Sequence, residues 1–113
     1  MIKRILLAIA AMAAMAPLVF GASFEVQLAW DANTERDMKE YRIYRTDGSR
    51  ELQVTVAHPV TTVGVPIFVA DGSEGVVKFR ATAVDLAGNE SGDSNEVSRP
   101  FDYRAPAAPV NLR

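Results

Sequence analysis

Short segments in which apolar and polar residues alternate constrain this chain more than any other feature of its sequence. In VVKFRATAV (residues 76–84), the apolar positions from Val77 to Ala83 alternate with two cations and Thr82. A period of two is typical of a strand with one buried and one solvated face. Similar segments occur at residues 23–30, 41–46, 52–57, 63–67 and 96–103. Turn-forming Gly, Asn, Asp and Pro separate them, so the sequence predicts an all-β, antiparallel sandwich or barrel of about six strands.

Two details of these segments give structural expectations. Leu52, Val54 and Val56 alternate with polar residues, which predicts that all three share the buried face of one strand. Pro66 and Pro100 fall inside predicted strands, and proline has no N–H to donate to a sheet. We therefore expect both prolines at sheet edges or bulges.

The beginning of the sequence is typical of a secretory signal peptide. Lys3 and Arg4 precede an uncharged apolar stretch at residues 5–19, and the small-residue segment FGAS follows. A membrane anchor is the alternative, but a spanning helix needs about 20 apolar residues, and Pro17 interrupts this stretch. The signal interpretation is therefore favoured.

Cleavage after Gly21 or Ala22 divides the chain into three parts. Residues 1–22 are predicted to be the signal peptide, 23–103 the β-domain and 104–113 a proline-rich tail. The mature protein is then expected in the periplasm or outside the cell, with no membrane attachment.

Charge and cysteine content exclude several classes of protein. Removing Lys3 and Arg4 from the 12 basic residues leaves 10 against 14 acidic ones, a net charge of −4, with no basic run. Nucleic-acid binding depends on phosphate neutralisation and is not expected. The chain has no cysteine, so disulfides cannot stabilise it and the hydrophobic core must do so.

Three segments together resemble a fibronectin type III domain. They are VQLAWDAN (26–33), YRIYR (41–45) and VVKFRATAVDLAGNESGDSNEV (76–97), and the resemblance covers residues 24–103. It implies an immunoglobulin-like β-sandwich with Trp30 in its core. Val77 stands where the family usually has a tyrosine. The family's first strand precedes the tryptophan strand, and here the predicted signal peptide occupies that place, so we expect this strand to be missing.

The tail resembles the proline-rich approach to such a first strand, although it follows the last predicted strand. Its candidate strand-forming residues are Pro109, Val110 and Leu112. Three alternatives remain open. The tail is a disordered remnant of a longer array, an extra edge segment on its own domain, or a strand donated to a second molecule, which would make a homo-oligomer.

The sequence contains no recognisable catalytic, cofactor-binding or metal-binding motif. The single histidine, His58, stands before a proline at a strand end, and no nucleophile or phosphate-binding motif accompanies it. Acidic residues gather in two predicted loops, at 31–37 and 85–96, without the spacing of a calcium loop. Turn capping and solubility are the simpler explanation of these carboxylates. We therefore predict no catalytic residue, no cofactor and no metal, and expect that the protein is not an enzyme.

Loops on a rigid sandwich frequently carry recognition, and the predicted fold brings these two loops to the same pole. The residues predicted for interaction are Asn33, Arg36, Asp37, Asn89, Glu90 and Asp93. The expected function is binding or structural, through protein or glycan contacts at these loops or at an open sheet edge. The alternatives are an assembly subunit that exchanges its tail strand, and an accessory module related to polysaccharide-degrading enzymes.

Overall fold

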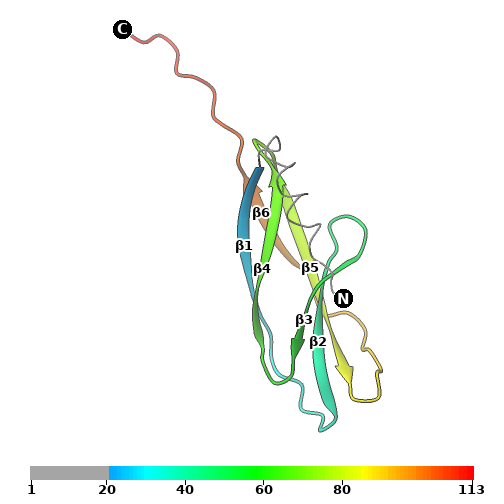
Figure 1. The fold of residues 1–113 in the computed structure, drawn as a ribbon. Coiled ribbons are helices and arrows are strands. Elements are labelled where there is room, and N and C mark those ends of the chain that lie inside the picture. The colour runs from blue at the N-terminus through cyan, green and yellow to red at the C-terminus, as the bar shows by residue number, and fades with distance from the viewer. Residues whose placement is uncertain (1–20) are drawn as a thin grey trace, which may run out of the picture.

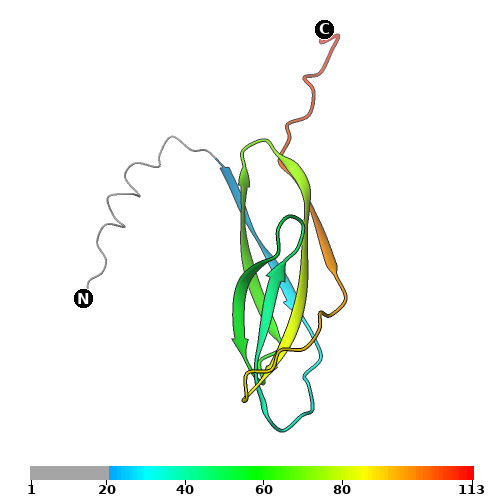
Figure 2. The ribbon, with the colours of Figure 1, turned by 90° about the vertical axis from the view of Figure 1, so that its right-hand side faces the viewer.

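The fold was analysed in a computed structural model, which describes residues 21–113. Six strands form two antiparallel sheets that pack face to face as an immunoglobulin-like β-sandwich (Figures 1 and 2). The strands are β1 (Gly21–Ala29), β2 (Met38–Arg45), β3 (Glu51–Ala57), β4 (Thr62–Ala70), β5 (Glu74–Asp85) and β6 (Val97–Asp102). The predicted fold class is confirmed. Residues 21–113 include no helix of the length and hydropathy that a membrane crossing requires.

The two sheets differ in width. One has the strand order β1-β4 and the other β3-β2-β5-β6. β3 and β4 contact each other across one flank of the sandwich. On the opposite flank, Phe24 of β1 packs against Phe101 of β6 at 5.6 Å between ring centroids. The narrow sheet therefore has β1 as its boundary strand on the β6 side.

The two ends of the sandwich have different roles. At one end, here called the loop pole, lie the connections at residues 30–37, 58–61 and 86–92 (Figure 1). At the other, the tail pole, β1 begins, β6 ends and residues 104–113 leave the domain (Figures 1 and 2). The predicted signal peptide lies mostly outside the described residues. β1 starts at Gly21, two residues before the predicted domain boundary at 23.

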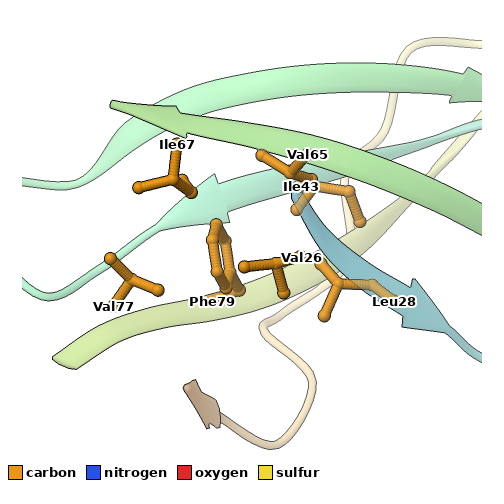
Figure 3. Close-up of a cluster of buried hydrophobic side chains, with 7 residues drawn as sticks. All are labelled: Val26, Leu28, Ile43, Val65, Ile67, Val77 and Phe79. Atoms are coloured by element: carbon orange, nitrogen blue, oxygen red, sulfur yellow. The ribbon is translucent and has the colours of Figure 1, made fainter. Parts of the chain in front are cut away.

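The core follows from the alternation in the sequence. Its buried residues come from β1, β2, β4 and β5 and are Val26, Leu28, Ile43, Val65, Ile67, Val77 and Phe79 (Figure 3). Trp30 packs against this cluster from one side and remains half-buried, because β1 ends at Ala29 and leaves the indole at the margin. Its ring meets Tyr41 edge-on at 5.3 Å.

Two expectations about side-chain facing were wrong. A bulge between Ile43 and Tyr44 shifts the pairing with β3, so Leu52 lies opposite Tyr44 and is 51% exposed. Thr82 was expected on a solvated face and is only 4% exposed. The chain after β5 folds back over it, which alternation within one strand does not reveal.

Candidate functional site

The two predicted loops do meet at the loop pole. The backbone N–H of Leu86 donates to the carbonyl of Asp37 at 2.8 Å and joins them. The first loop is fixed to the sheet by the buried Tyr41, whose hydroxyl accepts the N–H of Asn33 at 2.9 Å and lies 3.1 Å from His58 Nδ1. An open hollow of about 330 Å³ lies between the loops, and its lining includes Asn33, Asp37, Asn89 and Glu90.

Asn89 closes the turn that follows β5. Its backbone N–H donates to Asp85 Oδ1 at 2.8 Å, and its side-chain amide donates to Oδ2 at 3.0 Å. Both bonds lower the pKa of Asp85, and the bond from the Asn89 side chain has the larger effect. Gly88 supplies the positive φ of 92° that this tight turn requires. Asn89 therefore shapes its own loop.

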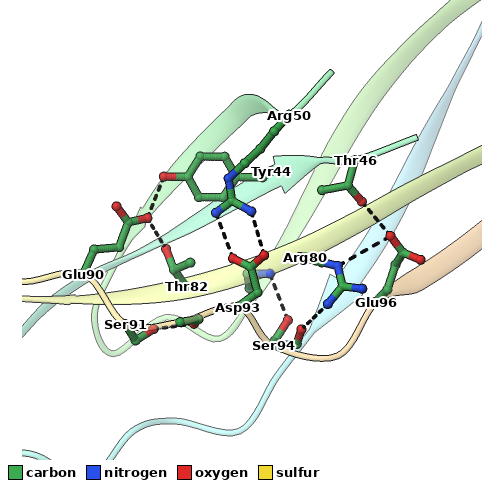
Figure 4. Close-up of polar contacts among 12 residues, drawn as sticks. Tyr44, Thr46, Arg50, Arg80, Thr82, Glu90, Ser91, Asp93, Ser94 and Glu96 are labelled. Atoms are coloured by element: carbon green, nitrogen blue, oxygen red, sulfur yellow. Dashed lines mark hydrogen bonds and ion pairs between the residues drawn. The ribbon is translucent and has the colours of Figure 1, made fainter. Parts of the chain in front are cut away.

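Glu90 folds down onto the outer face of the wide sheet (Figure 4). Its Oε2 accepts hydrogen bonds from the hydroxyls of Thr82 and Tyr44, each at 2.6 Å, while Arg42 Nη1 lies 3.3 Å from Oε1. The bond from Thr82, followed by that from Tyr44, lowers the pKa of Glu90. This carboxylate satisfies the buried Thr82 hydroxyl.

Asp93 makes a bidentate ion pair with Arg50. The guanidinium nitrogens lie 2.7 and 2.8 Å from the two carboxylate oxygens (Figure 4). Arg50 is also stacked over the Tyr44 ring, 3.9 Å from its centroid. The hydrogen bond from Arg50 lowers the pKa of Asp93. Sequence reasoning missed Arg50 and Tyr44, because nothing local marks contacts to residues more than 40 positions away.

Two serines continue the sheet where residues 90–96 form no regular strand. Ser91 and Ser94 donate their backbone N–H groups to the carbonyls of Ala83 and Ala81, each at 2.8 Å. Their hydroxyls accept the N–H groups of the same two alanines at 2.9 Å. Glu96 adds a hydrogen bond from Thr46 at 2.9 Å. The segment from Asn89 to Glu96 is thereby fastened to the sheet, and we call it the clamp segment.

The six predicted interaction residues fall into two groups, those whose side chains are bonded within the domain and those whose side chains are exposed. The side chains of Asn33, Asn89, Glu90 and Asp93 all make hydrogen bonds within the domain. Arg36 and Asp37 have exposed side chains. Within residues 21–113, no group of three or more His, Cys, Asp or Glu is arranged to hold a metal ion. The bonds of the first four side chains fix each loop internally and hold the loop after β5 to the wide sheet.

The lowered carboxyl pKa values give a pH dependence with a definite sign. A carboxyl with a depressed folded-state pKa stabilises the fold above its unfolded pKa, and this stabilisation is lost as pH falls through the folded pKa. The ordinary values are 4.5 for Glu90 and 3.8 for Asp93. The free energy of unfolding should therefore decline below about pH 4.5 in urea titrations. In Asp93→Asn the decline should be shallower, and superimposable profiles of variant and wild type would contradict this role.

A different surface lies along β1, where the backbone itself is open. The N–H of Trp30 donates to the carbonyl of Thr61 at 3.0 Å, in register with the β1–β4 ladder. Hydrogen-bonded positions alternate in an antiparallel pair, so the even-numbered residues of β1 bond to β4. The N–H and C=O groups of Ser23, Glu25, Gln27 and Ala29 point to the other side. Among residues 21–113 no strand pairs with that outer edge of β1.

Prolines lie on two of the other sheet edges. By the same alternation, Pro66 of β4 turns its nitrogen away from β1. In the β5–β6 pairing, the N–H of Tyr103 donates to the carbonyl of Ser73 at 2.8 Å, so the odd-numbered residues of β6 bond to β5. Pro100 is even-numbered and therefore turns its nitrogen away from β5. The predicted edge positions of both prolines are confirmed. A proline on an edge removes a donor and discourages strand addition, and β1 contains none.

An apolar hollow opens beside β1, between the two sheets. It has a volume of about 110 Å³, and its lining includes Leu28, Trp30, Ala81 and Val97. Nε1 of Trp30 is buried without a hydrogen-bond partner in the described part of the chain. Phe24, Trp30, Val97 and Phe101 are only partly buried on this flank. The core is therefore incompletely covered where the narrow sheet ends at β1.

Comparisons with known proteins identify the fold and no family. No family model and no curated protein matches the chain. Among solved structures, it is similar to the Clostridium perfringens spore cortex lytic enzyme SleM, with a TM-score of 0.50 and 18% sequence identity. The match covers 74% of this chain and 27% of that chain. At this identity the similarity shows a shared fold alone.

Proposed function

We propose that this protein is an exported, non-catalytic binding module that takes up an extended polypeptide segment as an added strand on the outer edge of β1. The fibronectin type III-like sequence pattern and the predicted signal peptide support a module acting outside the cytoplasm. The predicted loops are the weaker binding surface, because the side chains of four of their six candidate residues already make hydrogen bonds within the domain.

The observation that carries the proposal is a row of backbone groups at Ser23, Glu25, Gln27 and Ala29 with which no strand of residues 21–113 pairs. Incompletely covered apolar side chains lie beside this row. In strand addition, main-chain hydrogen bonds provide affinity, and alternate side chains enter neighbouring pockets. The hollow lined by Leu28 and Trp30 is such a pocket.

Proline substitution on β1 tests this function. Gln27 directs its N–H outward, so Gln27→Pro removes one outer donor and spares the bonds to β4. We expect that a panel of ten-residue peptides with alternating apolar residues contains binders of the wild-type protein. Gln27→Pro should weaken their binding at least about tenfold in fluorescence anisotropy, through one lost hydrogen bond and the added ring.

Gln27→Ala is the matched control, because it removes the same side chain and keeps the backbone donor. It should bind the peptides like wild type. If no peptide binds, or if both variants bind equally well, the β1 edge is not the binding surface.

A second candidate is an accessory module that contacts glycan, and the similarity to part of a spore cortex lytic enzyme favours it. The exposed side chains of Arg36 and Asp37 are the surface to test. Co-sedimentation with purified spore cortex, reduced in Arg36→Ala, would support this role, and recovery of all protein in the supernatant would exclude it.

A further inference from the structure

We propose, building on the proposed function, that the strand added to β1 is the C-terminal tail of a second copy of this chain, so that copies associate head to tail. Residues 104–113 form no strand in the structure, and every one of them is exposed. Val110 is 80% exposed and Leu112 is 95% exposed. These two apolar side chains alternate with Asn111 and Arg113, which is the pattern of a strand that covers one apolar face.

The domain directs its tail outward. The N–H of Tyr103 donates to the carbonyl of Ser73 at 2.8 Å, and the Tyr103 ring packs 6.1 Å from Phe24 and 6.4 Å from Phe101. Arg104 pairs with Glu74 at 3.0 Å. Beyond this anchor the tail continues away from the tail pole (Figures 1 and 2).

Strand direction favours a partner molecule over the tail's own domain. β1 runs from the tail pole to the loop pole. If the tail turned back on its own domain, it would run parallel to β1. If it continues outward, it meets a second copy at that copy's loop pole and runs antiparallel to that copy's β1, like every strand pairing in the domain.

The tail is long enough for this contact. Fully extended, its ten residues span about 33–36 Å, and β1 with its nine residues covers about 30 Å. Residues 104–108 can cross between the copies while residues 109–113 pair with the end of β1 at the loop pole. That end includes Gln27 and Ala29, beside the apolar hollow.

The alternation of the tail fixes its pairing register. When Val110 and Leu112 face the hollow, Asn111 lies opposite an outward-bonding residue of β1 and exchanges both backbone hydrogen bonds with it. Asn111, which has a φ of 58° in the free tail, becomes extended in this register. Pro109, two residues before Asn111, also turns its backbone toward β1 but has no N–H, so it contributes only its carbonyl, and Asn111 and Arg113 supply the donors from the tail.

Charge complements shape at this contact. The tail carries Arg104 and Arg113 and no acidic residue. The loop pole that it approaches is acidic: the first loop has Asp31, Glu35 and Asp37 against a single arginine. Opposite charges favour this docking orientation and make association weaken with added salt. Because donor and acceptor surfaces differ, each added copy presents a further free tail and a further free edge, and head-to-tail repetition of the contact along one direction generates a linear assembly.

Sedimentation velocity over a wide range of protein concentration tests the proposal. The average mass of the exported chain should rise with concentration. Association should weaken at least tenfold in Leu112→Asp and in Gln27→Pro, and Leu52→Asp should behave like wild type. Leu52 is the matched control, since it is 51% exposed and lies on β3, on the flank of the sandwich away from the β1 edge. If Gln27→Pro does not fold, Ala29→Pro blocks the same edge near the strand end.

Mixing two variants gives the sharpest outcome. A chain lacking residues 105–113 keeps its β1 edge but has no donor strand, and Gln27→Pro keeps its tail but has a blocked edge. Each alone should remain monomeric, and their mixture should form a one-to-one dimer that grows no further. A wild-type chain that is monomeric at all concentrations overturns the inference. The proposed function survives that result if peptides still bind the β1 edge, and fails with it if none binds.

Discussion

Replacing Phe79 by alanine is expected to destabilise the domain by about 3–5 kcal/mol, the usual cost of removing a buried phenylalanine side chain. Phe79 is 2% exposed, lies in the middle of β5 and contacts the core from the wide sheet (Figure 3). Its removal leaves a cavity that side chains of four strands would have to fill. Single domains have about 5–15 kcal/mol of stability in total, so the variant should unfold at much lower urea concentration.

Phe68→Ala provides the matched control. Phe68 also lies within a strand, β4, but is 75% exposed, so its truncation should change the free energy of unfolding by less than about 0.5 kcal/mol. Equilibrium urea unfolding, followed by tryptophan fluorescence, measures both variants. Equal losses of stability in the two variants would contradict the assignment of the core.

Replacing Glu90 by alanine should have the next largest effect on the fold. The Thr82 hydroxyl is buried and donates to Glu90, and without this acceptor it is left unsatisfied, at a cost of about 1–3 kcal/mol. The Tyr44 hydroxyl loses the same partner. We expect a lower unfolding midpoint and faster amide exchange along the clamp segment.

A double variant separates this explanation from a general loss of packing. Thr82→Val combined with Glu90→Ala removes donor and acceptor together, so it should be more stable than Glu90→Ala alone. The exposed Glu35, which accepts one bond from Asn33 at 3.2 Å, is the control, and Glu35→Ala should stay near wild type. If the double variant is less stable than the single one, Glu90 does not act through Thr82.

The strands and their order along the chain could be predicted because each has its own local pattern. Alternation located β1 to β6, and the prolines at 66 and 100 marked sheet edges. The exposure of the Leu52 side chain could not be predicted in this way, because the bulge between Ile43 and Tyr44 depends on how β2 and β3 pair. The burial of Thr82 likewise depends on a separate segment that returns over the sheet.

The candidate site could also be predicted only in part. Residue types identified the two loops, and the fold does bring them together. Whether a loop carboxylate points to solvent or to the sheet depends on distant partners, and Arg50 and Tyr44 draw Asp93 and Glu90 inward. The expected absence of the family's first strand already predicted an open sheet edge beside the tryptophan strand, which is β1. Only the pairing register reveals which backbone groups of β1 are turned outward.

Amide hydrogen exchange along β1 tests the binding edge most directly. In dilute protein, the amides of Glu25, Gln27 and Ala29 should exchange rapidly, while those of Val26 and Leu28, bonded to β4, stay protected. With a saturating strand-forming peptide, the outward amides should become protected as well. Protection of all β1 amides in the dilute protein, or outward amides that stay unprotected with peptide bound, would contradict strand addition at β1.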